Sequence, residues 1–239
     1  HSYLFDKHSG IGQIANAVNQ ANYVQAMHYM INADFDDISW TEYQPKDVRR
    51  YHSKQVDPLI LAIQQGFNQY KQSLLSADIN VKQIFASFNH FCLLTATHQG
   101  DSGRIASNLL CEQALGFDSD RIWYHGRAVM VKKNDLQTGL YNGDIGICLD
   151  IKGNGHLRVY FASSEGFNHF TVSRVPAHDT AFAITVHKSQ GSEFEQVLFM
   201  LPERVNPILN KALIYTAITR AKQNIQIWGQ KLLWEGLEN

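Results

Sequence analysis

The sequence predicts an α/β fold in which helices flank a parallel-sheet core and a small antiparallel β unit interrupts the chain. Three observations indicate this fold: amphipathic helical segments alternate with short apolar runs, Asn-Gly turns cluster in the middle of the chain, and the alternation resumes after Pro176. Helices and buried strands that alternate along a chain form parallel sheets with helices packed on their faces. The simplest architecture is therefore one α/β domain with a β insert.

Apolar residues recur three and four positions apart in the first part of the chain, which is the spacing of one helical face. The clearest case begins at Asp57, the expected N-cap, and Pro58, the expected first-turn residue. This periodicity predicts helices over 8–31, 57–75, 80–88 and 105–115. Phe91 to Ala96 is predicted to be a buried strand.

Short strand-like runs occupy the middle of the chain, over 128–131, 145–149, 157–161 and 170–175. Asn142-Gly143 and Asn154-Gly155 lie between them, and Asn-Gly flanked by strands is the strongest short signal for a hairpin. Residues 126–176 are thus predicted to form an antiparallel β unit. The pattern leaves open whether this unit is a small barrel or an antiparallel extension of the main sheet.

Composition excludes several classes of protein. The 239 residues carry 21 Lys and Arg against 22 Asp and Glu, and 44% are hydrophobic, which excludes a disordered tail, a collagen-like fibre and a strongly basic nucleic-acid arm. This net charge is compatible with a local basic groove for nucleic acid. The three cysteines are too scattered for a disulfide framework or a zinc site, so we expect no metal ligands and a reducing, cytoplasmic compartment. No apolar run is long enough for a membrane span.

The densest polar cluster follows a predicted strand over 181–184 and reads Thr-Val-His-Lys-Ser-Gln-Gly-Ser-Glu-Phe at 185–194, where we predict a polar turn or short helix over 185–190. Strand-end loops are where α/β sheets bind ligands. Gly191 allows close approach of a phosphate, the side chains before it offer donors, and Glu193 offers an acceptor. An ordinary solvated loop is the alternative interpretation.

A second polar cluster, Tyr-Thr-Ala-Ile-Thr-Arg-Ala-Lys at 215–222, follows a predicted strand over 197–201 and ends a predicted helix over 208–221. A last strand is predicted over 225–228. Arg220 either complements the helix dipole or senses a phosphate, for which its planar fork is suited.

Together the two clusters resemble motifs V and VI of superfamily 1 DNA helicases, in the expected order and context. The chain further resembles the RecD family, the alpha subunit of exodeoxyribonuclease V. This likeness is carried by Ser-Tyr-Leu-Phe-Asp-Lys-His-Ser-Gly-Ile-Gly-Gln-Ile-Ala at 2–15, Tyr-His-Gly-Arg-Ala-Val-Met-Val at 124–131 and Gly-Leu-Tyr-Asn-Gly-Asp-Ile-Gly-Ile at 139–147. It is weakest over 32–90.

The resemblance implies a second RecA-like motor domain, over 1–125 and 177–239, with an SH3-like barrel inserted over 126–176. It also implies ATP and Mg²⁺ as cofactors. The implied partners are single-stranded DNA, duplex ends and the other subunits of exodeoxyribonuclease V, and no membrane. The implied activity is 5′→3′ helicase action in double-strand break repair and recombination.

The resemblance also assigns roles to residues. Arg220 would reach the γ-phosphate of ATP, and the nucleotide would be approached by Gln190, Gly191 and Glu193. The single strand would be bound by Thr185, His187 and Lys188. Tyr215 is expected either at the interface of the motor domains or in the core.

Two departures from the family limit these expectations. Leu4 stands where the family's motif IV carries an arginine, and no Gly-x-x-x-x-Gly-Lys-[Ser/Thr] sequence occurs in the chain. We therefore expect part of a longer protein that does not hydrolyse ATP by itself. The alternatives are a stand-alone helicase of the same branch and a non-catalytic module that docks partners through 32–90.

Overall fold

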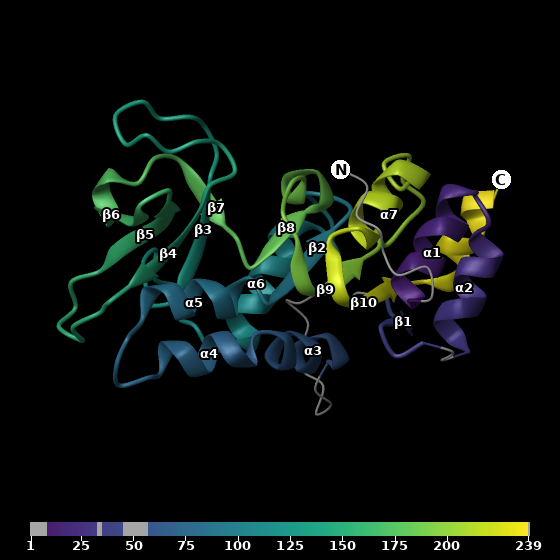
Figure 1. Cartoon of the computed structure of the whole chain (residues 1–239), viewed down its shortest axis with the longest axis horizontal. Helices are drawn as coiled ribbons and strands as arrows, with labels where there is room; N and C mark the ends of the chain where they lie inside the picture. The colour runs from purple at the N-terminus through teal and green to yellow at the C-terminus, as the bar shows by residue number, and fades with distance from the viewer. Residues whose placement is uncertain (1–8, 33–34, 45–56, 239) are drawn as a thin grey trace. The chain divides into compact units, whose positions relative to one another are not determined.

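The computed structural model describes residues 9–32, 35–44 and 57–238 (Figure 1). The chain divides into two compact units, of which the first comprises 1–55, 91–107 and 184–239 and the second comprises 56–90 and 108–183. Leu4 and the first half of the motif IV-like segment, 2–8, lie outside the described residues.

A five-stranded sheet forms the centre of the first unit, in the order β1-β10-β9-β2-β8. The pairs β1–β10, β10–β9 and β9–β2 are all parallel. This confirms the predicted parallel-sheet core. The strands are β1 (Ile38–Glu42), β2 (Phe91–Thr95), β8 (Ala183–Thr185), β9 (Phe194–Met200) and β10 (Ala221–Gly229).

The first unit also contains α1 (Gly10–Asn19), α2 (Tyr23–Ile31), α7 (Lys211–Ile218) and α8 (Lys231–Glu235). The single helix predicted over 8–31 is two helices. Ala21 adopts a left-handed conformation with φ of 57°, which ends α1, and the Asn22 side chain accepts the N–H of Gln25 to start α2.

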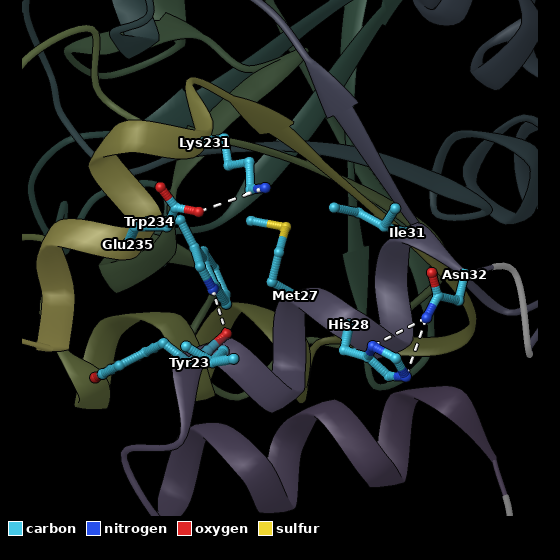
Figure 2. A pocket seen from close by; sticks show the side chains of 9 residues that line it. Tyr23, Met27, His28, Ile31, Asn32, Lys231, Trp234 and Glu235 are labelled. Atoms are coloured by element: carbon cyan, nitrogen blue, oxygen red, sulfur yellow. Dashed lines mark hydrogen bonds and ion pairs between the residues drawn. The ribbon is translucent and has the colours of Figure 1, made fainter.

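Trp234 of α8 is fully buried in the first unit. Its indole N–H donates to the carbonyl of Tyr23 at 2.9 Å, as Figure 2 shows, and the rings of Tyr23 and Trp40 meet it edge-on. Trp234 therefore joins α8 to α2 and to β1, two elements from the other end of the chain.

The second unit contains a separate antiparallel sheet in the order β6-β5-β4-β3-β7. The predicted antiparallel unit is thus confirmed, and it does not extend the main sheet. Closure into a barrel and the boundaries 126 and 176 stay predictions. The strands are β3 (Arg127–Val131), β4 (Ile145–Leu149), β5 (Arg158–Ser163), β6 (Gly166–Thr171) and β7 (His178–Thr180).

Three helices from 58–88 belong to the second unit: α3 (Pro58–Gly66), α4 (Asn68–Leu74) and α5 (Val81–Phe88). The helix predicted over 57–75 is interrupted at Phe67, whose ring is fully buried against Tyr70, Phe88 and Phe182. Gly66 directly precedes the interruption, and the buried Phe67 ring packs at the point where the helix breaks.

Helix α6 (Arg104–Ala114) supplies Asn108, a buried amide that fixes the chain entering β8. Its side-chain oxygen accepts the N–H groups of Phe182 and Ala183 at 2.9 and 3.0 Å, and its NH₂ donates to the carbonyl of Ala183 at 2.8 Å. The start of β8 is therefore held by side-chain bonds as well as by the sheet.

All three cysteines are buried as predicted, and none is in a disulfide. Among the described residues, no helix combines the length and the apolar character that crossing a bilayer requires.

Replacing Trp234 with Ala should lower the free energy of unfolding by about 3–5 kcal/mol, the usual cost of deleting a buried indole. Urea denaturation of the chain measures this loss. Leu232→Ala is the control on the same helix, since Leu232 is 79% exposed and its loss should cost about 0.5 kcal/mol or less. Equal losses for the two variants would contradict the assigned role of Trp234.

Candidate functional site at the amino edge of the parallel sheet

The two polar clusters meet at one edge of the sheet in the first unit. The loop over 186–193 leads directly into β9, and Arg220 directly precedes β10. Strands β9 and β10 are parallel, with Ala221 opposite Phe194, so both clusters lie at the amino ends of adjacent strands. The structure therefore brings together the two segments that the sequence singled out.

The guanidinium of Arg220 is held by three hydrogen bonds. Nε donates to the carbonyl of Thr216 at 3.1 Å, Nη1 donates to the carbonyl of Ser192 at 3.0 Å, and Nη2 donates to Oγ1 of Thr219 at 3.4 Å. A guanidinium has five N–H donors, so these bonds leave one donor on each terminal nitrogen for another acceptor. The arginine is thus fixed by its own helix end and by the loop before β9.

The main chain of Arg220 also contacts this loop, because its carbonyl accepts the N–H of Phe194 at 2.9 Å. Side chain and main chain of one residue therefore bind the residues on either side of Glu193. Glu193 is half-buried at this position. Its position beside Arg220 is set by the main-chain contacts of its two neighbours, Ser192 and Phe194.

The loop before β9 holds its own shape. It starts as a 3₁₀ turn, η3 (Val186–Ser189), in which the buried Ser189 hydroxyl donates to the carbonyl of Val186 at 2.7 Å. The N–H of Ser192 then donates to the carbonyl of Ser189 at 2.9 Å. Gly191 has φ of 87°, a left-handed conformation that favours glycine, and a side chain there would meet open space. The backbone at Gly191 is therefore open to a ligand.

The predicted site residues differ in exposure. Thr185 is half-buried at the end of β8, while the exposed residues are His187, Lys188, Gln190 and Gly191. Tyr215 is 40% exposed on α7, so it is not the core aromatic that one interpretation predicted. The ligand contacts of all these residues remain predictions.

A third segment is tied to the same edge and was not predicted. Asp37 immediately precedes β1, which pairs in parallel with β10. Its two carboxylate oxygens accept the N–H groups of Gly10 and Ile11 at 3.0 Å each, at the start of α1. The start of α1, which belongs to the described half of the motif IV-like segment, is therefore anchored at the amino end of β1.

A glutamate side chain lies at the opposite edge of the same sheet, where strand β9 ends. Glu203, just after β9, accepts the N–H groups of Asp101 and Ser102 at 3.3 Å and the Ser102 hydroxyl at 2.5 Å. Burial favours a higher pKa for Glu203, but the hydrogen bonds from Ser102 and from backbone N–H groups outweigh it and lower the pKa. The loop before α6 is thereby capped, a contact between residues far apart in sequence that no local pattern predicts.

A pocket of about 230 Å³ lies elsewhere in the first unit, between α2 and α8. In Figure 2, Met27 and Trp234 face its interior, the Lys231–Glu235 ion pair lies at one side and the His28–Asn32 contact at the other. No predicted site residue lines this pocket. Among the described residues there is also no group of three or more His, Cys, Asp or Glu side chains that could hold a metal ion.

Residues 180–226, which contain both motif-like clusters, match the family of UvrD-like helicase C-terminal domains. The RecBCD enzyme subunit RecD of Haemophilus influenzae is 32% identical over 98% of this chain and 37% of that protein. The same subunit of Buchnera aphidicola is 29% identical over 98% of this chain and 38% of its own length. The ATP-dependent RecD2 DNA helicase of Deinococcus radiodurans is 34% identical over 46% of this chain and 15% of that protein.

Among solved structures, Pif1 helicase from Candida albicans is similar over 72% of this chain and 54% of that chain, with a TM-score of 0.44 and 15% identity. The family model and the curated relatives make the chain a helicase-related sequence. Within that class it belongs to the RecD family, as the motifs predicted. It spans less than two fifths of the length of the RecD proteins named above.

Glu203→Gln should remove a pH-dependent part of the stability. A carboxyl whose pKa is lowered by folding stabilises the native state above its unfolded pKa, and this contribution is lost as the pH falls through the folded pKa. The stability difference between wild type and Glu203→Gln should therefore be largest near neutral pH and shrink under acid conditions, as followed by urea denaturation across pH. Glu165→Gln, on an exposed turn, should show no such trend. A difference that grows toward acid pH would refute the inference.

Proposed function

We propose that this chain supplies the second RecA-like motor domain of an ATP-dependent DNA helicase. The observation that carries the proposal is the position of Arg220, whose guanidinium is hydrogen-bonded to the loop over 186–193 at the amino edge of the sheet. A phosphate-sensing side chain and the predicted DNA-facing residues would then belong to one connected piece of structure.

The RecD relatives support a more specific proposal. The whole protein would be the 5′→3′ helicase subunit of exodeoxyribonuclease V. It would act in the cytoplasm on single strands and duplex ends, in double-strand break repair and recombination, together with the other subunits of that enzyme.

In this proposal Arg220 stabilises the charge on the γ-phosphate during ATP hydrolysis. Its planar fork matches phosphate oxygens, and an arginine in this role contributes about 10³–10⁵ to turnover in other phosphoryl-transfer enzymes. The three bonds described above hold the side chain before ATP arrives. Less conformational freedom is then lost when its remaining donors bind phosphate.

The nucleotide would be approached by the loop over 190–193. Gly191 lets the backbone come close because it carries no side chain, Gln190 beside it is exposed, and Glu193 offers acceptor oxygens. The Mg²⁺ that accompanies ATP would be held mainly by a P-loop domain, since the Walker A sequence is not among these 239 residues.

The single strand would be bound by the start of the same loop. The hydroxyl of Thr185, the imidazole of His187 and the ammonium of Lys188 are donors suited to phosphates. Phosphate contacts supply affinity without sequence preference, which is what a translocating motor requires.

We further propose that strands β3 to β7 are the SH3-like insert of the family. Their apolar side chains gather into one buried cluster that includes Val129, Val131, Cys148, Val159 and Phe161. A small sheet that curls on itself encloses its inward side chains in this way.

A stand-alone helicase of the same branch is the second candidate, and the similarity to the Deinococcus radiodurans helicase favours it. Purification of the full-length protein from its own cells distinguishes the two. Stable association with nuclease subunits supports the RecBCD-like assignment, and an active helicase without them supports the alternative.

The chain of 239 residues alone should show no ATP turnover above background, with or without single-stranded DNA, because it lacks the P-loop lysine. A phosphate-release assay measures this directly. Robust turnover by the purified chain would refute the proposal that ATP hydrolysis requires a P-loop domain outside these residues.

In the full-length protein, Arg220→Ala should reduce DNA-stimulated ATP turnover by about 10³-fold or more and abolish unwinding, while affinity for single-stranded DNA stays near wild type. Arg121→Ala is the matched control, because its side chain is 75% exposed and pairs only with Asp118 among the bonds described for it. Unwinding by the Arg220 variant at a normal rate would remove the basis of the proposal.

A further inference from the structure

Two carboxylates flank Phe194 at the start of β9, and one lysine joins them. Lys222 Nζ lies 3.7 Å from a carboxylate oxygen of Glu193 and 3.8 Å from one of Glu195. Residues two apart in an extended segment point to the same side, which is why a single ammonium reaches both. Lys222 is on β10, two residues after Arg220.

The arrangement contributes little to stability. The three side chains are 48%, 25% and 35% exposed for Lys222, Glu193 and Glu195, and ion pairs at this exposure contribute about 0–1 kcal/mol each. These ion pairs matter because of where they lie, at the edge of the sheet beside Arg220. Any anion that binds the remaining donors of Arg220 approaches an edge that already holds two negative charges, and Lys222 is the cation that contacts both of them.

We propose that Lys222 is a positioning residue for the nucleotide, an inference that rests on the proposed function. It holds the Glu193 carboxylate in one orientation beside Arg220 and offsets the repulsion that Glu193 and Glu195 exert on an incoming triphosphate. Lys222 acts through the two glutamates, so its effect falls on nucleotide affinity, whereas Arg220 acts on the phosphoryl-transfer step.

The test measures KM for ATP and kcat of the full-length protein at saturating single-stranded DNA. Lys222→Met should raise KM about fivefold and leave kcat within about twofold, since losing one charge contact near water-exposed groups changes binding by up to about tenfold. The rise should shrink at high salt because the charges are exposed. Lys222→Gln is a second neutral variant with the same expectation, and thermal unfolding confirms that each variant is folded.

Two further variants test the charge at position 222 and its action through the glutamates. Lys222→Arg should restore KM to near the wild-type value. Adding Glu195→Gln to Lys222→Met should recover most of the lost affinity, because one uncompensated carboxylate is removed. Lys231→Met, which breaks an exposed ion pair on α8, is the matched control and should leave KM unchanged.

An unchanged KM in both neutral variants would overturn the proposal. So would a raised KM that Glu195→Gln fails to lower, since the lysine would then bind phosphate itself. Arg220→Ala, measured in parallel, reports on the proposed function separately: if it lowers turnover while the Lys222 variants behave as wild type, only the positioning role fails. Normal turnover in Arg220→Ala would mean that the proposed function fails.

Discussion

The parallel pairing of β9 with β10 is the constraint on which the candidate site depends. It places Ala221 opposite Phe194 and lets the carbonyl of Arg220 accept the N–H of Phe194, so the two motif-like segments share an edge. Both strands are largely buried, and Val197–Met200 of β9 pack on both faces of the sheet, as is usual for a parallel strand. The register shifts once between Ala221 and Asn224, and the hydrogen bond from Arg220 to Ser192 lies beside the pairing of Ala221 with Phe194.

The elements that the sequence predicted well are those that bury a continuous face. The strand at 91–96 and the helices over 80–88 and 105–115 were found within a residue or two. Strand β1 was not predicted, because Ile-Ser-Trp-Thr-Glu is short and half-buried and its pairing partner β10 lies far along the chain. The breaks at Ala21 and Phe67 were also missed, since neither residue is a strong breaker; Ala21 is an exposed residue with positive φ, and Phe67 is a buried ring.

For the site, residue types were predictable and contacts were not. The spacing at 185–194 and 215–222 selected the segments, but it left Arg220 between a helix-end role and a phosphate-binding role. The structure shows the helix-end contact through Thr216 and leaves two donors for a ligand, so the two roles are compatible. Asp37 and Glu203 escaped prediction because each binds residues far away in sequence, and a solitary charge in a loop carries no local signal. Lys222 ends the second predicted cluster, but its contacts with Glu193 and Glu195 depend on strand pairing and were not predicted.

The order of strands in the two sheets has a consequence for biosynthesis. In the second unit most strands pair with their sequence neighbours, so this unit can form while the ribosome is still adding residues. In the first unit two interior strands, β9 and β10, follow the other three in sequence, and they are the parallel partners of β2 and β1. The apolar segment Phe91–Thr95 therefore has no β9 partner until the residues between Thr95 and Phe194 have been added, and it can associate with other chains during that interval.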